Sequence, residues 1–327
     1  MFLLDYTKLK KGDIILSRRD NETSARIREL TKSDFSHARL YVGAQSCIDS
    51  DGPGVHAENI QRIAFEKETD VLVLRYCQEL DERIIDEVIA SARRKIGTQY
   101  SKSEARKAVH SPDDNAAEPN RQFCTRFVAQ AYFEAGYTVV ENPNYCTPND
   151  FVRSNMMIKV ESPLRVADKV DMEIVHEDDS LTGFQKQVIN DLMEQIRSLT
   201  GADIQIFEQI GDYLIKNPQY DAGVVRILHA TGFTSMWMIV RNESPHFYDY
   251  NLLVEAMPNE EERIRFAKQQ VIDEPDIRRR FEESFETNRN YYNKYKLEFF
   301  KTLRDLNRLL IDESKWRQTI CLIASRG

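Results

Sequence analysis

The stretch SHARLYVG at residues 36–43, together with QFCTRFVA at residues 122–129, decides the predicted fold. Side chains alternate in character along the first stretch, which predicts a β-strand with two different faces. One face carries His37, Arg39 and Tyr41, and the other carries Ala38, Leu40 and Val42. In the second stretch apolar residues recur at helical spacing as far as Gly136, so we expect a helix that begins near Cys124.

Short strands and helices are predicted around these two segments in the first half of the chain. Further strands are predicted at residues 14–16, 46–50 and 71–75, and helices at residues 22–30 and 81–95. The strand at 46–50 follows the strand at 36–43 closely enough to pair with it as an antiparallel hairpin. The polar stretch from Ser101 to Gln122 predicts a surface loop.

The second half of the chain has the pattern of a helical domain. Its strongest signal is an apolar and aromatic stripe from Ile277 to Leu310, which predicts one continuous helix of ~50 Å. An acid-rich stretch at residues 168–180 separates the halves, so the predicted domains are residues 1–168 and 169–327. The predicted class is α+β, with a small antiparallel sheet packed on helices and a mostly α-helical domain after it.

Composition narrows the classes of function. The 327 residues include 45 Lys and Arg against 53 Asp and Glu, a net charge of −8, which argues against a nucleic-acid partner. The sequence has no basic leader segment and no apolar run near the ~18 residues of a membrane span, so we expect neither a signal peptide nor an integral membrane segment. The five cysteines form no CxxC pair, so we expect no metal, no cofactor and a cytoplasmic location.

Cys124 is the leading candidate for chemistry. Free backbone N–H groups and the positive end of the helix dipole favour a thiolate at a helix start, and they also suit an oxyanion. A cysteine nucleophile needs a neighbouring base, and His37 is the candidate. A third residue must orient the imidazole. Asp49, on the next strand, competes for that role with His56 and Glu58.

The order of several motifs makes the first half recognisable. The motifs are GDIIL at residues 12–16, SHARLYVG at 36–43, CIDS at 47–50, GTQY at 97–100, FCTRFVAQAY at 123–132 and TPND at 147–150. In this order they resemble the circularly permuted papain-like branch of the NlpC-type cysteine hydrolases, which includes the lecithin-retinol-acyltransferase-like proteins. The resemblance covers about residues 8–160, and the C-terminal half resembles no family that we recognise.

The resemblance implies a role for each candidate residue. Cys124 is the expected nucleophile, His37 the base and Asp49 the orienting residue, where several relatives carry glutamate. Tyr100 matches a recurrent tyrosine that lines the cleft. Arg126 stands where many relatives carry glutamate, which implies a different preference for substrate charge. We therefore take Tyr100, Arg126 and Tyr41 as the substrate-binding candidates.

Three functions remain open from the sequence. The first is a cysteine hydrolase that cleaves an amide or peptide bond through an acyl-enzyme on Cys124. The second is a lipid-directed acyltransferase or thioesterase with the same Cys-His pair. The third is a non-enzymatic binding or effector module, because a fold does not guarantee activity. The C-terminal helices, with the aromatic residues Tyr292, Tyr295 and Phe299, offer a surface for a protein partner or for self-association.

Overall fold

The computed structural model describes residues 1–19, 21–110, 121–176 and 180–326. The chain divides into two units, Met1–Thr182 with Gln205–Phe207, and Gly183–Ile204 with Glu208–Gly327. The predicted division between residues 168 and 169 falls at the start of α6 (Lys169–His176). This helix belongs to the first unit, where Arg62 Nη1 donates to the carbonyl of Ile174 over 3.1 Å.

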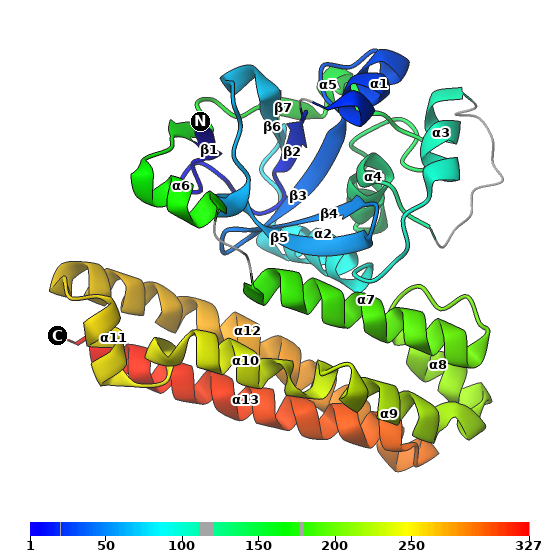
Figure 1. The fold of residues 1–327 in the computed structure, drawn as a ribbon, viewed down its shortest axis with the longest axis vertical. Coiled ribbons are helices and arrows are strands. Elements are labelled where there is room, and N and C mark those ends of the chain that lie inside the picture. Colours follow the sequence, from blue (N-terminus) through cyan, green and yellow to red (C-terminus); the bar gives the residue numbers. More distant parts are fainter. Residues whose placement is uncertain (20, 111–120, 177–179, 327) are drawn as a thin grey trace. The chain divides into compact units, whose positions relative to one another are not determined.

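An antiparallel sheet of six strands forms the centre of the first unit (Figure 1). Its order is β5-β4-β3-β2-β6-β7, and a separate pair joins β1 to β8. The strands are β1 (Phe2–Leu4), β2 (Ile14–Ser17), β3 (His37–Gly43), β4 (Ser46–Asp51), β5 (Gly54–Asn59), β6 (Val71–Tyr76), β7 (Met157–Lys159) and β8 (Leu164–Val166). The predicted hairpin is present, since β3 and β4 pair with Arg39 opposite Asp49.

The two faces of β3 enter different surroundings, as the alternation predicts. Ala38, Leu40 and Val42 pack into the main apolar core with α2 (Glu82–Arg94) and α4 (Cys124–Glu134). Tyr41 enters a second apolar cluster that also contains Cys47. Burial of the apolar face of β3 against α4 therefore fixes the start of this helix beside the first residues of the strand.

Four further helices complete the first unit: α1 (Glu22–Thr31), α3 (Lys102–His110), α5 (Pro148–Arg153) and α6. Helix α3 corrects the prediction of a loop from Ser101 to Gln122. Ser101 Oγ accepts the backbone N–H of Glu104 over 3.1 Å, and the Glu104 side chain is fully buried. The Ser101 cap and the buried Glu104 carboxylate stabilise a helix that the polar composition of this stretch does not predict. Residues 111–120 of the expected loop lie outside the described part of the chain.

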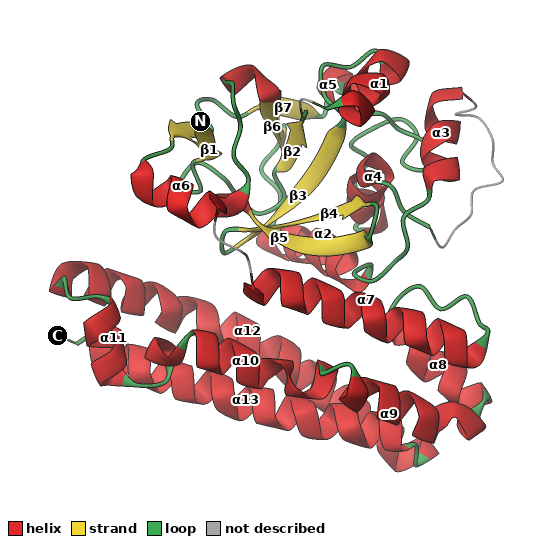
Figure 2. Cartoon of the chain, in the orientation of Figure 1, coloured by secondary structure: helices red, strands yellow, loops and turns green. Residues whose placement is uncertain are grey.

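The second unit is built from helices (Figure 2). They are α7 (Ser180–Thr200, shared with the first unit), α8 (Glu208–Lys216), α9 (Asp221–Ala230), α10 (Met236–Glu243), α11 (Tyr250–Ala256), α12 (Glu260–Tyr295) and α13 (Glu298–Ala324). The predicted continuous helix from Ile277 to Leu310 is wrong, because the chain turns between α12 and α13. Lys296 takes the left-handed conformation there, with φ +58°, and the two long helices pack as a hairpin.

The α+β class predicted from the sequence is confirmed. Among the described residues no single helix has the length and apolar composition of a membrane span, although the bent pair Pro218–Ala230 and Phe233–Glu243 passes that test together. All five cysteines are free thiols. The expected cytoplasmic location, self-association and lack of nucleic-acid binding stay predictions.

Candidate active site

Cys124 is the first residue of α4 and is 9% exposed. The first hydrogen bond inside the helix runs from Phe127 N–H to the carbonyl of Phe123 over 2.9 Å. The helix therefore makes no use of the N–H groups of its first residues, including that of Cys124. Phe123, the N-cap residue, has no side-chain oxygen to accept them. The thiol thus lies beside donors that can bind a negatively charged oxygen.

His37 opens β3 and connects two candidate residues through its ring. Nε2 donates to Asp49 Oδ2 over 2.6 Å, a short charge-assisted contact. The other ring nitrogen, Nδ1, is left for the hydrogen bond between His37 and Cys124. The side chain of His37 is 20% exposed, whereas that of Asp49 is 1% exposed, so the base faces the solvent side and its partner lies behind it.

The pKa values of the two reactive groups move in opposite directions. Burial and the Arg39 guanidinium lower the pKa of His37, but Asp49 and the hydrogen bond with Cys124 outweigh them and raise it to about 9. Burial raises the pKa of the Cys124 thiol, but His37 and the backbone N–H of Ala38 outweigh burial, and the pKa falls below its usual value. The pair is therefore poised as thiolate and imidazolium.

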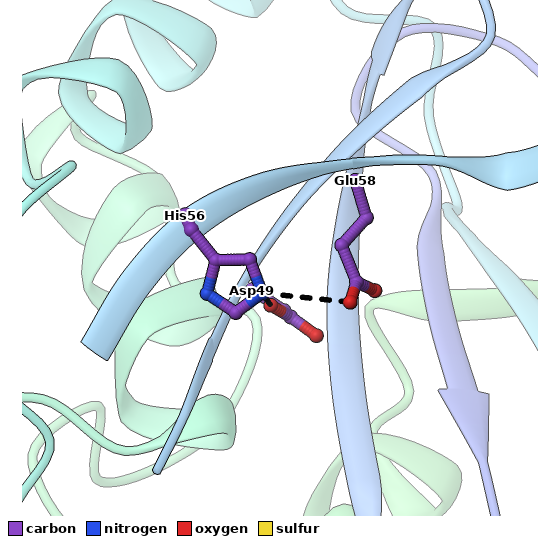
Figure 3. A group of neighbouring side chains, drawn as sticks. All are labelled: Asp49, His56 and Glu58. Carbon is purple, nitrogen blue, oxygen red and sulfur yellow. Dashed lines mark hydrogen bonds and ion pairs between the residues drawn. The ribbon is translucent and has the colours of Figure 1, made fainter. Parts of the chain in front are cut away.

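Asp49 belongs to a cluster of charged side chains with Arg39, His56 and Glu58. Figure 3 shows three of them, Asp49, His56 and Glu58. Their ligand atoms all lie within 4.8 Å of one another, a spacing that suits a metal ion. However, Arg39 Nε lies 3.2 Å from Asp49 Oδ2 and 3.2 Å from Glu58 Oε2. A buried cation therefore already balances one oxygen of each carboxylate. Of the three candidates for the orienting role, Asp49 alone has a hydrogen bond with His37 among the described contacts.

Tyr100 reaches the site through a loop that is held from two sides. Its backbone pairs with Gln122, just before Cys124, and Val55 N–H donates to the carbonyl of Thr98 over 2.9 Å. Burial raises the pKa of the Tyr100 hydroxyl well above its usual value, and the neighbouring charge of Cys124 raises it further. The structure thus brings Tyr100 into the surroundings of Cys124, and its role as a substrate contact stays a prediction.

A residue remote in the sequence also holds this loop. Gln205, which is 1% exposed and belongs to the first unit, accepts the N–H of Gln99 over 3.1 Å. Its own amide nitrogen donates to Gln99 Oε1 over 3.2 Å. No motif marks Gln205, because a glutamine in the connection between α7 and α8 has the pattern of an ordinary polar surface position.

Arg126 has surroundings that differ from those predicted. It is fully buried, and its Nη1 donates to Glu104 Oε2 over 3.0 Å. The guanidinium also lies 5.5 Å from the ring centroid of Tyr145, whose hydroxyl donates to the same Glu104 oxygen over 2.7 Å. Arg126 therefore joins α4 to α3 through a buried ion pair, and its role in substrate binding stays a prediction.

Tyr41, the third predicted substrate contact, lies in apolar surroundings, and its role in substrate binding stays a prediction. It is 5% exposed within the second apolar cluster, and its hydroxyl accepts the N–H of Gln45 over 3.4 Å. It shares a face with His37, but it lies four residues further along β3 and packs between apolar side chains. Arg39 is a residue of the site that the sequence did not single out. Its guanidinium contacts the carboxylates of Asp49 and Glu58, and the alternation along β3 places it on the same face as His37.

Comparison with known proteins matches residues 8–175 to the family model described as permuted papain-like amidase enzyme, YaeF/YiiX, C92 family. Among solved structures, the chain is similar to the crystal structure of metalloprotein YiiX from Escherichia coli O157:H7. That match has 20% identity and a TM-score of 0.38, and it covers 47% of this chain and 97% of that one. No curated protein matches the chain.

Proposed function

Because the chain belongs to the C92 family of permuted papain-like amidases, we propose that it is a cysteine hydrolase that cleaves an amide or peptide bond. One observation carries this proposal: His37, the first residue of β3, lies between Cys124 at the start of α4 and the buried carboxylate of Asp49, which is 2.6 Å away. A base, a nucleophile and an orienting anion in this arrangement have the parts of a Cys-His-Asp triad.

The proposed reaction proceeds through two steps. The Cys124 thiolate attacks the carbonyl carbon of the substrate, and N–H groups at the start of α4 stabilise the oxyanion. His37 Nδ1–H then protonates the leaving nitrogen, the C–N bond breaks, and an acyl-enzyme remains on sulfur. Neutral His37 next takes a proton from water, the hydroxide attacks the thioester, and Cys124 leaves as the thiolate. Asp49 holds the ring in the required tautomer throughout.

We also propose that the first half of the chain is related to the NlpC-type hydrolases and the lecithin-retinol-acyltransferase-like proteins. This relationship rests on the motif order around His37 and Cys124, and it extends the substrate class from peptides to other amides and acyl groups. Tyr100 is the proposed substrate contact, because its hydroxyl is close enough to Cys124 to be influenced by its charge and its backbone pairs with Gln122 just before the nucleophile.

Turnover of a panel of chromogenic amides and esters by the full-length chain tests the proposal, with the acyl-enzyme followed by intact mass spectrometry. We expect amide cleavage and a mass increase equal to the acyl group, and a loss of at least about a thousandfold in Cys124→Ala and His37→Ala. Ester turnover with transfer to an added alcohol would favour the acyltransferase. Equal turnover by Cys124→Ala, or none by any variant with any substrate, would contradict a cysteine hydrolase.

A further inference from the structure

We infer that His56 is a positioning residue, held as an imidazolium, that fixes the Asp49 carboxylate in place for His37. The inference rests on the proposed function, because it concerns the triad described above. The first support for this role is the set of hydrogen-bonding groups around the ring.

The groups that the described contacts place at the two ring nitrogens of His56 are acceptors. Nδ1 lies 3.0 Å from the carbonyl oxygen of Gly54 and 3.6 Å from Asp51 Oδ1. Nε2 lies 3.3 Å from Asp49 Oδ1 and 3.4 Å from Glu58 Oε1. A carbonyl oxygen and an ionised carboxylate cannot donate, so each ring nitrogen must carry a hydrogen. Only the imidazolium has two such hydrogens.

The surrounding charges require the same state. Asp49 and Glu58 each direct one oxygen to Arg39 Nε and the other to His56 Nε2. Asp49 Oδ1 is fully buried and makes no hydrogen bond of good geometry, so the charge of the ring is its compensation. With His56 positive, Arg39 and His56 balance Asp49 and Glu58, and Asp51 Oδ1, 3.6 Å from Nδ1, adds a further negative charge that favours the imidazolium.

The arrangement gives His56 two effects on the triad. While Nε2–H donates to Glu58 Oε1, the charge of the ring attracts Asp49 Oδ1 across 3.3 Å, which leaves Oδ2 directed at His37 Nε2. Its positive charge also stabilises the Cys124 thiolate and weakens the pull of Asp49 on the His37 proton. Removal of that charge must therefore raise the pKa of both Cys124 and His37, whereas removal of the Glu58 charge must lower both.

Among the described residues, the charged and titratable groups that act on His56 come from three strands and one loop. They are Arg39 on β3, Asp49 and Asp51 on β4, Glu58 on β5, and Tyr100, which interacts with Asp51. Burial lowers the pKa of His56, but the hydrogen bond with Glu58 and the charges of Asp49 and Asp51 outweigh burial and raise it. This direction agrees with the geometric argument.

The pH dependence of Cys124 alkylation by iodoacetamide in the full-length chain tests the inference without any substrate. We expect His56→Gln to move the midpoint upward by about one pH unit and Glu58→Gln to move it downward by a similar amount. His176→Gln is the matched control, because His176 is an exposed histidine of the same unit. A purely structural role would slow alkylation at every pH without opposite shifts of the midpoint.

Nitrogen NMR of the wild-type ring provides a readout that needs no variant to fold. Two protonated nitrogens on His56 at pH 7 are expected. A neutral ring, an unchanged midpoint in His56→Gln, or shifts of the same sign in both variants would overturn the inference. So would one equivalent of tightly bound zinc on Nε2, which would make the cluster a metal site. Failure of amide turnover would refute the proposed function but would leave these readouts intact.

Discussion

Asp49→Asn is the substitution that isolates the electrostatic part of the proposed triad. The asparagine keeps the shape of the side chain and its amide oxygen can still accept from His37, but it carries no charge. The contact that it weakens is the 2.6 Å hydrogen bond between His37 Nε2 and Asp49 Oδ2, whose carboxylate is 1% exposed. Because Arg39 stays close by, the histidine ring would lose its main anionic partner and keep a cationic neighbour.

The magnitude follows from the pKa of His37. That pKa is about 9, against an ordinary value of 6.5, and the difference corresponds to about 3.4 kcal/mol in favour of the imidazolium. Without the charge of Asp49, burial and Arg39 still lower the pKa, so we expect it to fall to roughly 6.5 or below. At pH 8 the imidazolium population of His37 would then fall from roughly nine-tenths to about 3% or less. The Cys124 thiolate would lose its counter-charge with it.

The assay is an NMR titration of the His37 ring in wild type and Asp49→Asn, with iodoacetamide labelling of Cys124 at pH 8 on the same samples. We expect the ring to titrate near neutrality in the variant and Cys124 to label more slowly. Asp34→Asn, at an exposed position just before β3, is the control and should change neither. An unchanged titration of His37 in Asp49→Asn would refute the reasoning, because the carboxylate would then not be the source of its raised pKa.

Three further substitutions test how the surroundings hold the site. Gly54 has φ +117°, and a Cβ there would lie 2.5 Å from the carbonyl oxygen of Thr98. We therefore expect Gly54→Ala to lower the free energy of unfolding by about 2 kcal/mol or more, measured by thermal denaturation. An unchanged melting temperature would contradict the close approach. Arg126→Met breaks the buried pair with Glu104 and should cost about 3 kcal/mol, whereas a raised KM at full stability would restore Arg126 as a substrate contact. In the helical unit, Glu274→Gln removes a buried charge that accepts from Ser314 and Arg317 over 2.7 and 2.6 Å, and a loss of about 2 kcal/mol in urea denaturation is expected; full stability would show that the pair contributes nothing there.

The sequence predicts the local geometry of the site well, because two periodic patterns determine it. Alternation along residues 36–43 and the short connection to residues 46–50 bring Asp49 within reach of His37, but they do not distinguish it from His56 and Glu58, and only the observed contact does. Helical spacing after Cys124 is enough to place the thiol at a helix start. Both patterns are local, and the structure confirms both elements.

The remaining features depend on contacts between distant segments. Arg126 follows Cys124 closely, but its partner Glu104 lies on a helix hidden within a polar stretch, so its burial has no local signal. The break between α12 and α13 occurs at Lys296 without a glycine or proline, while the apolar stripe continues across it. The charge of His56 likewise follows only from acceptors that sheet pairing brings together.

The central claim is that His37 makes Cys124 a thiolate, and the rate of iodoacetamide labelling at each cysteine against pH tests it most directly. Cys77 is the internal reference, because it is more exposed than Cys124. The account predicts that Cys124 labels faster than Cys77 below the ordinary thiol pKa of ~8.5, and that His37→Ala abolishes this advantage. Labelling of Cys124 that follows exposure alone, slower than Cys77 at every pH and unchanged in His37→Ala, would contradict it.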